Sequence, residues 1–174
     1  MSDWPRGRGP SDRIERLYDE QAAGLYRYAL MILADGESAG DVVQQVFLRL
    51  VSGAADGAES TIRLPAESAA VSAYLLRAVR NECYSVLRGH ERRQIGIEQS
   101  HMIEPVDPGG DPAERVLVEQ ALRALPPEQR EVVHLKIFEG RTFQEIADLT
   151  GESINTAASR YRYAIEKLKG LLSS

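Results

Sequence analysis

Residues 140–160 read GRTFQEIADLTGESINTAASR, which is two short helical patterns separated by a glycine. Thr142 and Glu145 stand three residues apart, the spacing of a capping box, in which each side chain accepts a hydrogen bond from the other residue's backbone N–H. Gly151 supplies the turn, because glycine adopts the left-handed conformation at little steric cost. Ser153 is placed to cap the second helix. The stretch therefore predicts a helix-turn-helix.

The second helix of this motif has an apolar side and a polar side. Apolar side chains recur at helical spacing and are expected to point inward: Ala157, Tyr161, Ala164, Ile165 and Leu168. The outward side then holds Asn155, Thr156, Ser159, Arg160, Arg162 and Tyr163. Amides, hydroxyls and guanidinium groups are the donors and acceptors that read DNA base edges. The alternative is a helical hairpin whose outer face meets only water, but such a face usually mixes its charges, and here no acid follows Arg160 until Glu166.

Charge restricts how the chain meets nucleic acid. The 174 residues carry a formal net charge of -5, which argues against non-specific coating of DNA through overall basicity. Positive charge is local instead. Residues 77–93 hold five arginines against two glutamates, and residues 153–174 hold four basic residues against one glutamate. Two basic patches on an acidic chain fit a protein whose DNA binding depends on a larger partner.

Several function classes find no support in the sequence. Cys83 is the single cysteine, so an internal disulfide is impossible, and its helical surroundings favour a packing role. The three histidines, His90, His101 and His134, lack metal-ligand spacing, and no nucleophile elbow or phosphate-binding glycine loop occurs. We therefore expect no enzyme, no cofactor and no metal. Because no apolar run approaches a membrane span or a signal peptide, the expected location is cytoplasmic, without membrane insertion.

Hydrophobic periodicity predicts an all-α chain of two small helical domains on a flexible linker. Helical stripes run from Ile14 to a stop near Asp35-Gly36, from Asp41 to Val51, and from about Ala70 to Arg88. Small residues, glycine and proline mark residues 52–69 as a long loop. In the second half, Pro126-Pro127 interrupts the helical pattern, and a new helix is expected from there to about Phe138. The expected divisions are a mobile tail at 1–11, a first domain at 12–93, a linker at 94–111 and a second domain at 112–174.

At this point the chain resembles a known family. The segment LPPEQREVV at 125–133, followed by residues 140–160, resembles region 4 of extracytoplasmic-function (ECF) bacterial sigma factors. The segment DVVQQVFLRL at 41–50 is similar to their region 2.2, and residues 74–88 to the helix that carries regions 2.3 and 2.4. The three matches occur in the family's order and cover most of the chain. The resemblance implies a subunit that binds core RNA polymerase and directs it to the minus-10 and minus-35 promoter elements.

The resemblance also implies roles for individual residues. The clamp helices of the polymerase beta-prime subunit would bind Asp41, Gln44, Gln45 and Arg49. The minus-10 element would meet Arg77, Arg80, Asn81, Tyr84 and Arg88. The minus-35 element would meet Asn155, Thr156, Ser159, Arg160, Arg162 and Tyr163. Further expected partners are the polymerase beta flap and promoter DNA, and an anti-sigma factor is left open.

Two other functions compete with this one. A stand-alone helix-turn-helix regulator needs only the C-terminal half, and the region 2 matches count against it. A sigma-like decoy would bind polymerase without melting DNA. This reading rests on the acidic charge and on a divergent region 2, in which the loop at 52–69 is longer and poorer in aromatic residues than expected and Ser85 stands where the family often has an acid.

Overall fold

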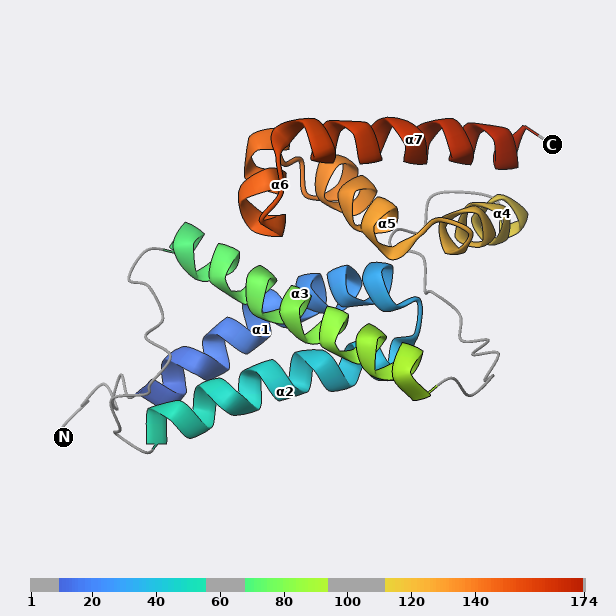
Figure 1. Cartoon of the computed structure of the whole chain (residues 1–174). Helices are drawn as coiled ribbons and strands as arrows, with labels where there is room; N and C mark the ends of the chain where they lie inside the picture. Colours follow the sequence, from blue (N-terminus) through green and yellow to red (C-terminus); the bar gives the residue numbers. More distant parts are fainter. Residues whose placement is uncertain (1–9, 56–67, 94–111, 174) are drawn as a thin grey trace, which may run out of the picture.

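The computed structural model describes residues 10–55, 68–93 and 112–173, and every regular element within them is a helix. The first half of the chain forms a bundle, the lower layer of Figure 1, from three helices: α1 (Pro10–Leu33), α2 (Gly36–Ala55) and α3 (Ser68–Arg93). The second half lies above it and consists of α4 (Pro112–Arg123), α5 (Pro127–Val133), the π-helix η1 (His134–Phe138), α6 (Phe143–Thr150) and α7 (Ile154–Leu172). The predicted all-α fold is confirmed.

A sharp corner joins α1 to α2 where the sequence predicted the first helix to stop. Ala34 adopts a left-handed backbone conformation with φ of 56° and breaks the helical path. Asp35 then starts α2, because its Oδ2 accepts a hydrogen bond from the Ser38 backbone N–H at 2.8 Å. This bond satisfies one of the backbone donors left unpaired at a helix start.

The helices of the first bundle are longer than their periodicity predicted. α2 continues to Ala55, so the loop expected from residue 52 begins later. The reason is that alanine is the best helix former and one glycine costs only about 1 kcal/mol in a helix. α3 likewise runs from Ser68 to Arg93. The centre of the expected loop at 56–67, most of the expected tail and the expected linker at 94–111 lie outside the described residues.

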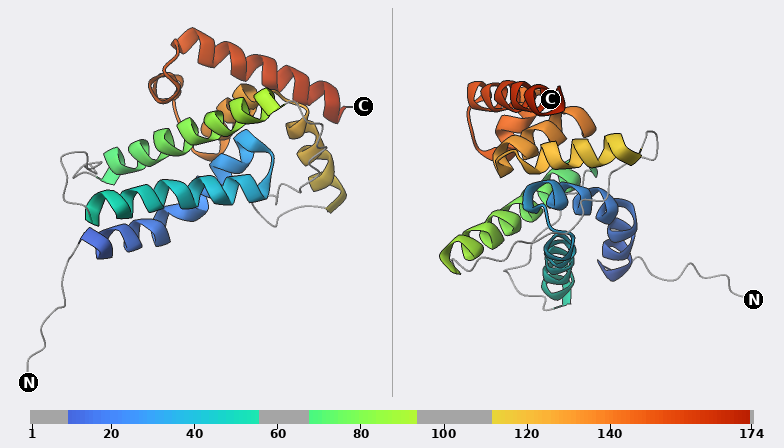
Figure 2. Two further views of the ribbon diagram at one scale, coloured as in Figure 1. Left: turned by 60° about the horizontal axis from the view of Figure 1, so that its bottom comes forward. Right: turned by 90° about the vertical axis from the view of Figure 1, so that its right-hand side faces the viewer.

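The main hydrophobic core spans both halves of the chain. Tyr28 and Ile32 of α1 and Leu75 and Val79 of α3 are fully buried in it. The same cluster includes side chains from the second half, namely Val132, Leu135, Ile146 and Ala157. Two views of the fold show α5 and α6 on the layer formed by α1 and α3, with α7 packed across their outer side (Figure 2). The sequence predicted two tethered modules, and it did not anticipate this shared core.

Arg130 of α5 fixes the two halves to each other through the backbone. Its guanidinium donates to the carbonyls of Met31 at 2.7 Å and Ile32 at 2.8 Å, which are unpaired acceptors at the end of α1. It also donates to the carbonyls of Arg123 and Leu125 at the corner between α4 and α5. A buried cation at the C-terminus of a helix is favoured by the helix dipole. One side chain therefore positions α5 on the end of α1.

The helix predicted to run to Phe138 changes geometry on the way. After α5 the chain forms a π-helix, in which the Glu139 backbone N–H bonds to the His134 carbonyl at 3.2 Å, five residues back. His134 stacks on Phe138 with ring centroids 5.5 Å apart, and it also contacts the ring of Tyr28 from α1. The wide turn thus places an aromatic side chain in the interface between the two halves.

Candidate nucleic-acid and polymerase interfaces

The helix-turn-helix has the local geometry that its sequence predicted. The Thr142 hydroxyl accepts from the Glu145 backbone N–H at 3.2 Å, and the Glu145 carboxylate accepts from the Thr142 N–H at 2.7 Å. Gly151 ends α6 in the left-handed conformation with φ of 74°. The Ser153 hydroxyl then caps α7 by accepting from the Thr156 N–H at 3.0 Å. The capping box, the glycine turn and the second cap are therefore all confirmed.

The outer side of α7 carries the residues predicted for the minus-35 element. Asn155, Arg162 and Tyr163 are exposed, whereas the remaining three, Thr156, Ser159 and Arg160, are half-buried. Arg160 is not a free cation, because its Nη1 lies 2.6 Å from the Glu152 carboxylate in the turn. Sequence reasoning looked for an acid along α7 and so overlooked Glu152, which reaches Arg160 from before the helix.

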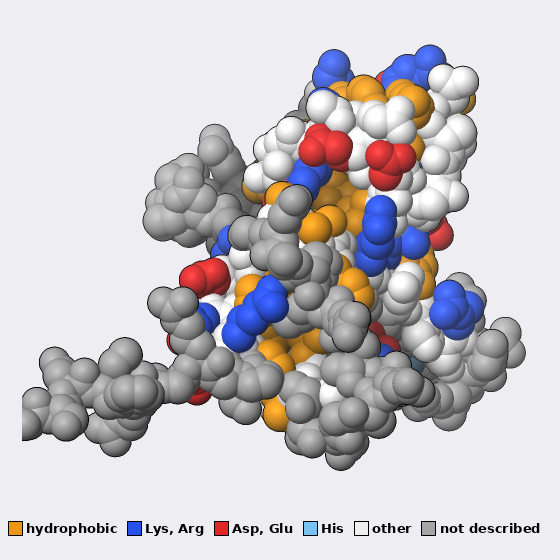
Figure 3. All heavy atoms as spheres, turned by 90° about the vertical axis from the view of Figure 1, so that its left-hand side faces the viewer, with side chains coloured by type: hydrophobic (Ala, Val, Ile, Leu, Met, Phe, Trp, Pro, Cys, Tyr) orange, Lys and Arg blue, Asp and Glu red, His pale blue; other side chains and the backbone are white. Residues whose placement is uncertain are grey.

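A space-filling view of one face shows how charge is distributed among the described residues (Figure 3). Lys and Arg side chains lie in separate groups over both halves of the molecule, and Asp and Glu side chains lie among them. Positive charge on this face is therefore local rather than continuous.

The residues of α3 predicted for the minus-10 element fall into two sets. Asn81 and Arg88 are exposed to solvent. Arg77 is also exposed, but its Nη2 donates to the backbone carbonyl of Asp148 in α6 at 3.1 Å. Arg80 and Tyr84 are half-buried beneath the second half of the chain. Three of the five predicted DNA contacts therefore meet the helix-turn-helix half of the same molecule.

Glu131 of α5 is the centre of that contact. Its Oε1 accepts from the Tyr28 hydroxyl at 2.6 Å and from Arg80 Nε at 2.7 Å, and its Oε2 accepts from the Tyr84 hydroxyl at 2.7 Å. The Glu131 side chain is fully buried, so three donors replace the water it loses. We call these four residues, Tyr28, Arg80, Tyr84 and Glu131, the Glu131 cluster.

Burial and the Glu131 carboxylate shift the ionisation of their neighbours. Burial raises the pKa of the Tyr28 phenol well above its usual value, and the charge and hydrogen bond of Glu131 raise it further. The pKa of Tyr84 is raised for the same reasons. Burial alone would lower the pKa of Arg80, but the Glu131 carboxylate outweighs it and the pKa is raised. The cluster therefore keeps two neutral phenols and one guanidinium cation around one carboxylate.

The predicted polymerase face lies along the exposed side of α2. Asp41, Gln44, Gln45 and Arg49 are all exposed. The opposite side of the helix packs into the core through Val42, Val43, Val46, Phe47 and Leu50. Arg49 also pairs with Glu82 of α3 at 2.7 Å. The structure thus gathers the four predicted residues on one surface.

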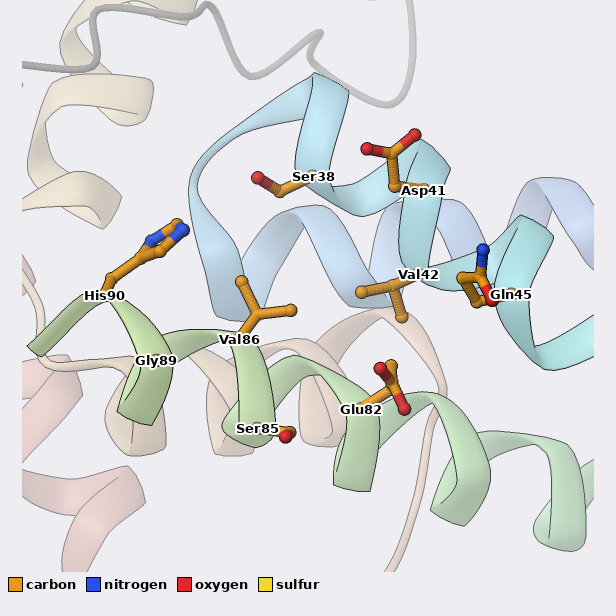
Figure 4. A pocket seen from close by; sticks show the side chains of 9 residues that line it. All are labelled: Ser38, Asp41, Val42, Gln45, Glu82, Ser85, Val86, Gly89 and His90. Carbon is orange, nitrogen blue, oxygen red and sulfur yellow. The ribbon is translucent and has the colours of Figure 1, made fainter. Parts of the chain in front are cut away.

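A shallow pocket adjoins this face between α2 and α3 (Figure 4). Ser38, Asp41, Val42 and Gln45 line it from α2, and Glu82, Ser85, Val86, Gly89 and His90 line it from α3. Asp41 makes its rim acidic, the nearby Glu82 is paired with Arg49, and Val42 and Val86 give it an apolar lining. Such a pocket suits a partner side chain with an aliphatic stem and a basic end.

Comparison with known proteins assigns both halves to one family. A family model described as Sigma-70 region 2 matches residues 17–93, and one described as Sigma-70, region 4 matches residues 115–168. The ECF RNA polymerase sigma factor SigL of Mycobacterium tuberculosis is 33% identical over 160 residues, which cover 90% of this chain and 86% of the relative.

The chain is an ECF sigma factor.

Two further likenesses agree with this assignment. The RNA polymerase sigma factor CarQ of Myxococcus xanthus is 26% identical over 167 residues, covering 94% of this sigma factor and 91% of CarQ. A sigma factor RpoE from Bartonella quintana, co-crystallised with the anti-sigma factor NepR, has a TM-score of 0.70 at 24% identity, covering 94% of this chain and 98% of that one. The second likeness is one of fold.

Membership settles the general function that the sequence predicted. The protein acts as a sigma factor, which binds RNA polymerase and recognises promoters, and sigma factors are transcription regulators rather than enzymes. In the part of the chain that the structure describes, no helix is long and apolar enough to cross a membrane. Nor do three or more His, Cys, Asp or Glu side chains gather there as a metal site would require.

The residues that sequence reasoning missed are those that join region 2 to region 4. Glu131 was read only as part of the region 4 motif, Tyr28 was given no role, and Arg80 and Tyr84 were assigned to DNA. No local signal identified Glu131, because helical spacing turns its side chain away from the mean direction of Val132 and Val133, and the pattern therefore predicts exposure.

Proposed function

We propose that this sigma factor docks on polymerase through the exposed side of α2, contacts the minus-10 element through α3 and reads the minus-35 element through α7. The observation that carries the proposal is the arrangement of α2, which buries five apolar side chains and leaves Asp41, Gln44, Gln45 and Arg49 on one open surface. Adjacent glutamines supply donors and acceptors without the cost of burying charge.

The surface of α3 supports the second part of the proposal. Asn81 and Arg88 project to solvent, and Arg77 and Arg80 lie on the same helix. Arginine neutralises phosphates, whereas an asparagine amide can also hydrogen-bond a base edge. Tyr84 adds a ring on which an unpaired base can stack, once the ring is free.

For the third part, the first turn of α7 presents Asn155 beside backbone N–H groups that favour a phosphate. Arg162 and Tyr163 extend the same surface, with the guanidinium 5.1 Å from the ring centroid. We propose that these residues bind the minus-35 major groove, that the beta flap binds region 4 and that the protein contributes no catalysis of its own. We further propose a cytoplasmic location beside the polymerase.

The domain divisions and one more partner complete the proposal. We propose that residues 12–93 and residues 112–174 are the two domains, with residues 94–111 as the linker between them. An anti-sigma factor is a proposed partner, supported by the complex in which the Bartonella quintana protein was crystallised.

The test of docking is a double variant, Asp41→Lys with Gln45→Ala, mixed with core RNA polymerase. We expect weaker binding in co-elution and in equilibrium titration, because the variant removes one amide, with its acceptor and its donor, and reverses one charge on the docking face. Asp19→Lys is the matched control, since Asp19 is exposed on α1 and the charge change is the same. Equal affinity of the double variant and the control would show that the α2 face does not dock.

A further inference from the structure

The minus-10 face of this sigma factor is occupied by its own region 4. Arg80 Nε lies 2.7 Å from Glu131 Oε1, the Tyr84 hydroxyl lies 2.7 Å from Glu131 Oε2, and Arg77 Nη2 lies 3.1 Å from the Asp148 carbonyl. These three side chains belong to the proposed DNA surface of α3. A promoter strand cannot take the same donors while region 4 holds them.

The occupying group has the chemistry of a nucleic-acid phosphate. The Glu131 carboxylate presents two anionic oxygens to a guanidinium and two hydroxyls, which are the donors that commonly bind phosphate. The Glu131 side chain is fully buried, with an exposed fraction of 0%. Apolar side chains of region 4, including Val132 and Ile146, are buried in the core shared with region 2.

Promoter geometry requires a different arrangement of the two regions. The names of the minus-10 and minus-35 elements give their positions, which are about 25 base pairs apart, or about 85 Å along B-form DNA. In the structure, α3 contacts α6 of the helix-turn-helix directly through Arg77 and Asp148. The chain between Arg93 and Pro112 can extend to about 60 Å, so the two regions remain connected when they separate.

We propose that the structure is a closed state of the sigma factor, in which the Glu131 cluster blocks the minus-10 face and must open before that face binds DNA. The proposal rests on the proposed function, because it takes α3 as the minus-10 surface. In the open state, Arg80 and Tyr84 release the Glu131 carboxylate and bind promoter DNA instead. Free protein is then inhibited by its own region 4, and a partner that binds the separated regions shifts the population toward the open state.

The test measures the affinity of free protein for a single-stranded oligonucleotide that carries a minus-10 element selected by the holoenzyme. The first variant is Tyr28→Phe, which removes one hydrogen bond to Glu131 and keeps the ring. Tyr28 lies on α1 and outside the proposed DNA surface. Because apparent affinity scales with the open fraction, we expect binding to tighten on the order of tenfold. Tyr18→Phe is the matched control, since it removes the same atom from an exposed ring on the same helix.

A second variant, Glu131→Gln, removes the charge that Arg80 faces and is expected to tighten binding on the order of a hundredfold. Circular dichroism and thermal melting establish whether this variant folds, and Tyr28→Phe carries the test if it does not. Equal affinity of wild type, Tyr28→Phe and Tyr18→Phe for the oligonucleotide would overturn the closed state.

A separate measurement keeps the two proposals distinguishable. Asn81→Ala alters an exposed residue of α3 that lies outside the Glu131 cluster. If the holoenzyme made with Asn81→Ala and Arg88→Ala binds its minus-10 element as wild type does, the assignment of α3 to DNA fails. If that holoenzyme binds more weakly while Tyr28→Phe leaves the free protein unchanged, only the closed state fails.

Discussion

Arg160, which we propose binds the minus-35 element, is held by a neighbouring acid. Its guanidinium is held by Glu152 at 2.6 Å, with side chains 28% and 24% exposed, so its orientation is fixed before DNA arrives. A partly exposed ion pair of this kind contributes at most about 1 kcal/mol to stability. A guanidinium that pairs with a guanine edge contributes about 1 to 3 kcal/mol to discrimination between bases.

We therefore predict that Arg160→Ala relaxes the preference at one minus-35 position and leaves the melting temperature almost unchanged. Competition between randomised minus-35 sequences, with wild-type and variant holoenzyme, measures the preference. The control is Glu152→Gln, which keeps the guanidinium but loosens it and should weaken discrimination less. If affinity falls evenly for all sequences, Arg160 binds a phosphate, and if nothing changes, this side of α7 does not face DNA.

The ionisation of Cys83 predicts how the stability of the fold depends on pH. Burial in the core, followed by the charges of Glu131 and Glu82, raises the pKa of its thiol to about 12. In the unfolded chain a thiol ionises from about pH 8.5. The folded state therefore binds this proton more tightly, and its contribution to stability is complete below pH 8.5 and is lost as pH rises toward 12.

Ionisation of this thiol in the unfolded chain should make the free energy of unfolding about 2 kcal/mol lower at pH 10 than at pH 7. Urea titrations at the two pH values, run on wild type and on Cys83→Ala, isolate this effect because the tyrosines remain in both proteins. The wild type should lose more stability than the variant. Identical losses would mean that the Cys83 thiol is not shifted by the fold.

At the scale of elements, the turn between α6 and α7 depends on one backbone conformation. Gly151 has φ of 74°, and an added Cβ would meet no atom within 4 Å, so strain alone opposes a side chain there. Gly151→Ala should destabilise region 4 by about 1 kcal/mol. Gly170→Ala is the control, since Gly170 lies inside α7 with equally open space and should stabilise the helix by about 0.5 to 1 kcal/mol. Thermal melts in which Gly151→Ala is as stable as wild type would contradict this account of the turn.

Local elements of this kind could be predicted from the sequence. Thr142, Glu145, Gly151 and Ser153 act on backbone groups within four residues, so their roles can be read directly from spacing. The polar side of α2 followed in the same way from the apolar period of its neighbours. The π-helix at His134–Phe138 could not be predicted, because it arises where the chain packs across the interface rather than from a local preference.

At the scale of the whole molecule, the decisive contacts join residues far apart in the sequence. Glu131 meets Tyr28 from 103 positions away and Tyr84 from 47 positions away. An acid in an amphipathic helix ordinarily faces water, so its pattern alone predicts exposure. Periodicity describes each helix separately and carries no information on which helix covers which. The packing of region 4 on region 2 therefore came only from the structure.

The central claim is that this sigma factor recognises promoters as part of the polymerase and not alone. Its net charge of -5 and the occupation of Arg77, Arg80 and Tyr84 by region 4 leave the free protein few phosphate contacts. The most direct measurement is a gel-shift titration of one promoter duplex, selected by the holoenzyme, with free protein and with holoenzyme at physiological salt. We predict tight, sequence-specific binding by the holoenzyme and weak binding by the free protein. Tight and sequence-specific binding by the free protein would contradict the account and identify a stand-alone regulator.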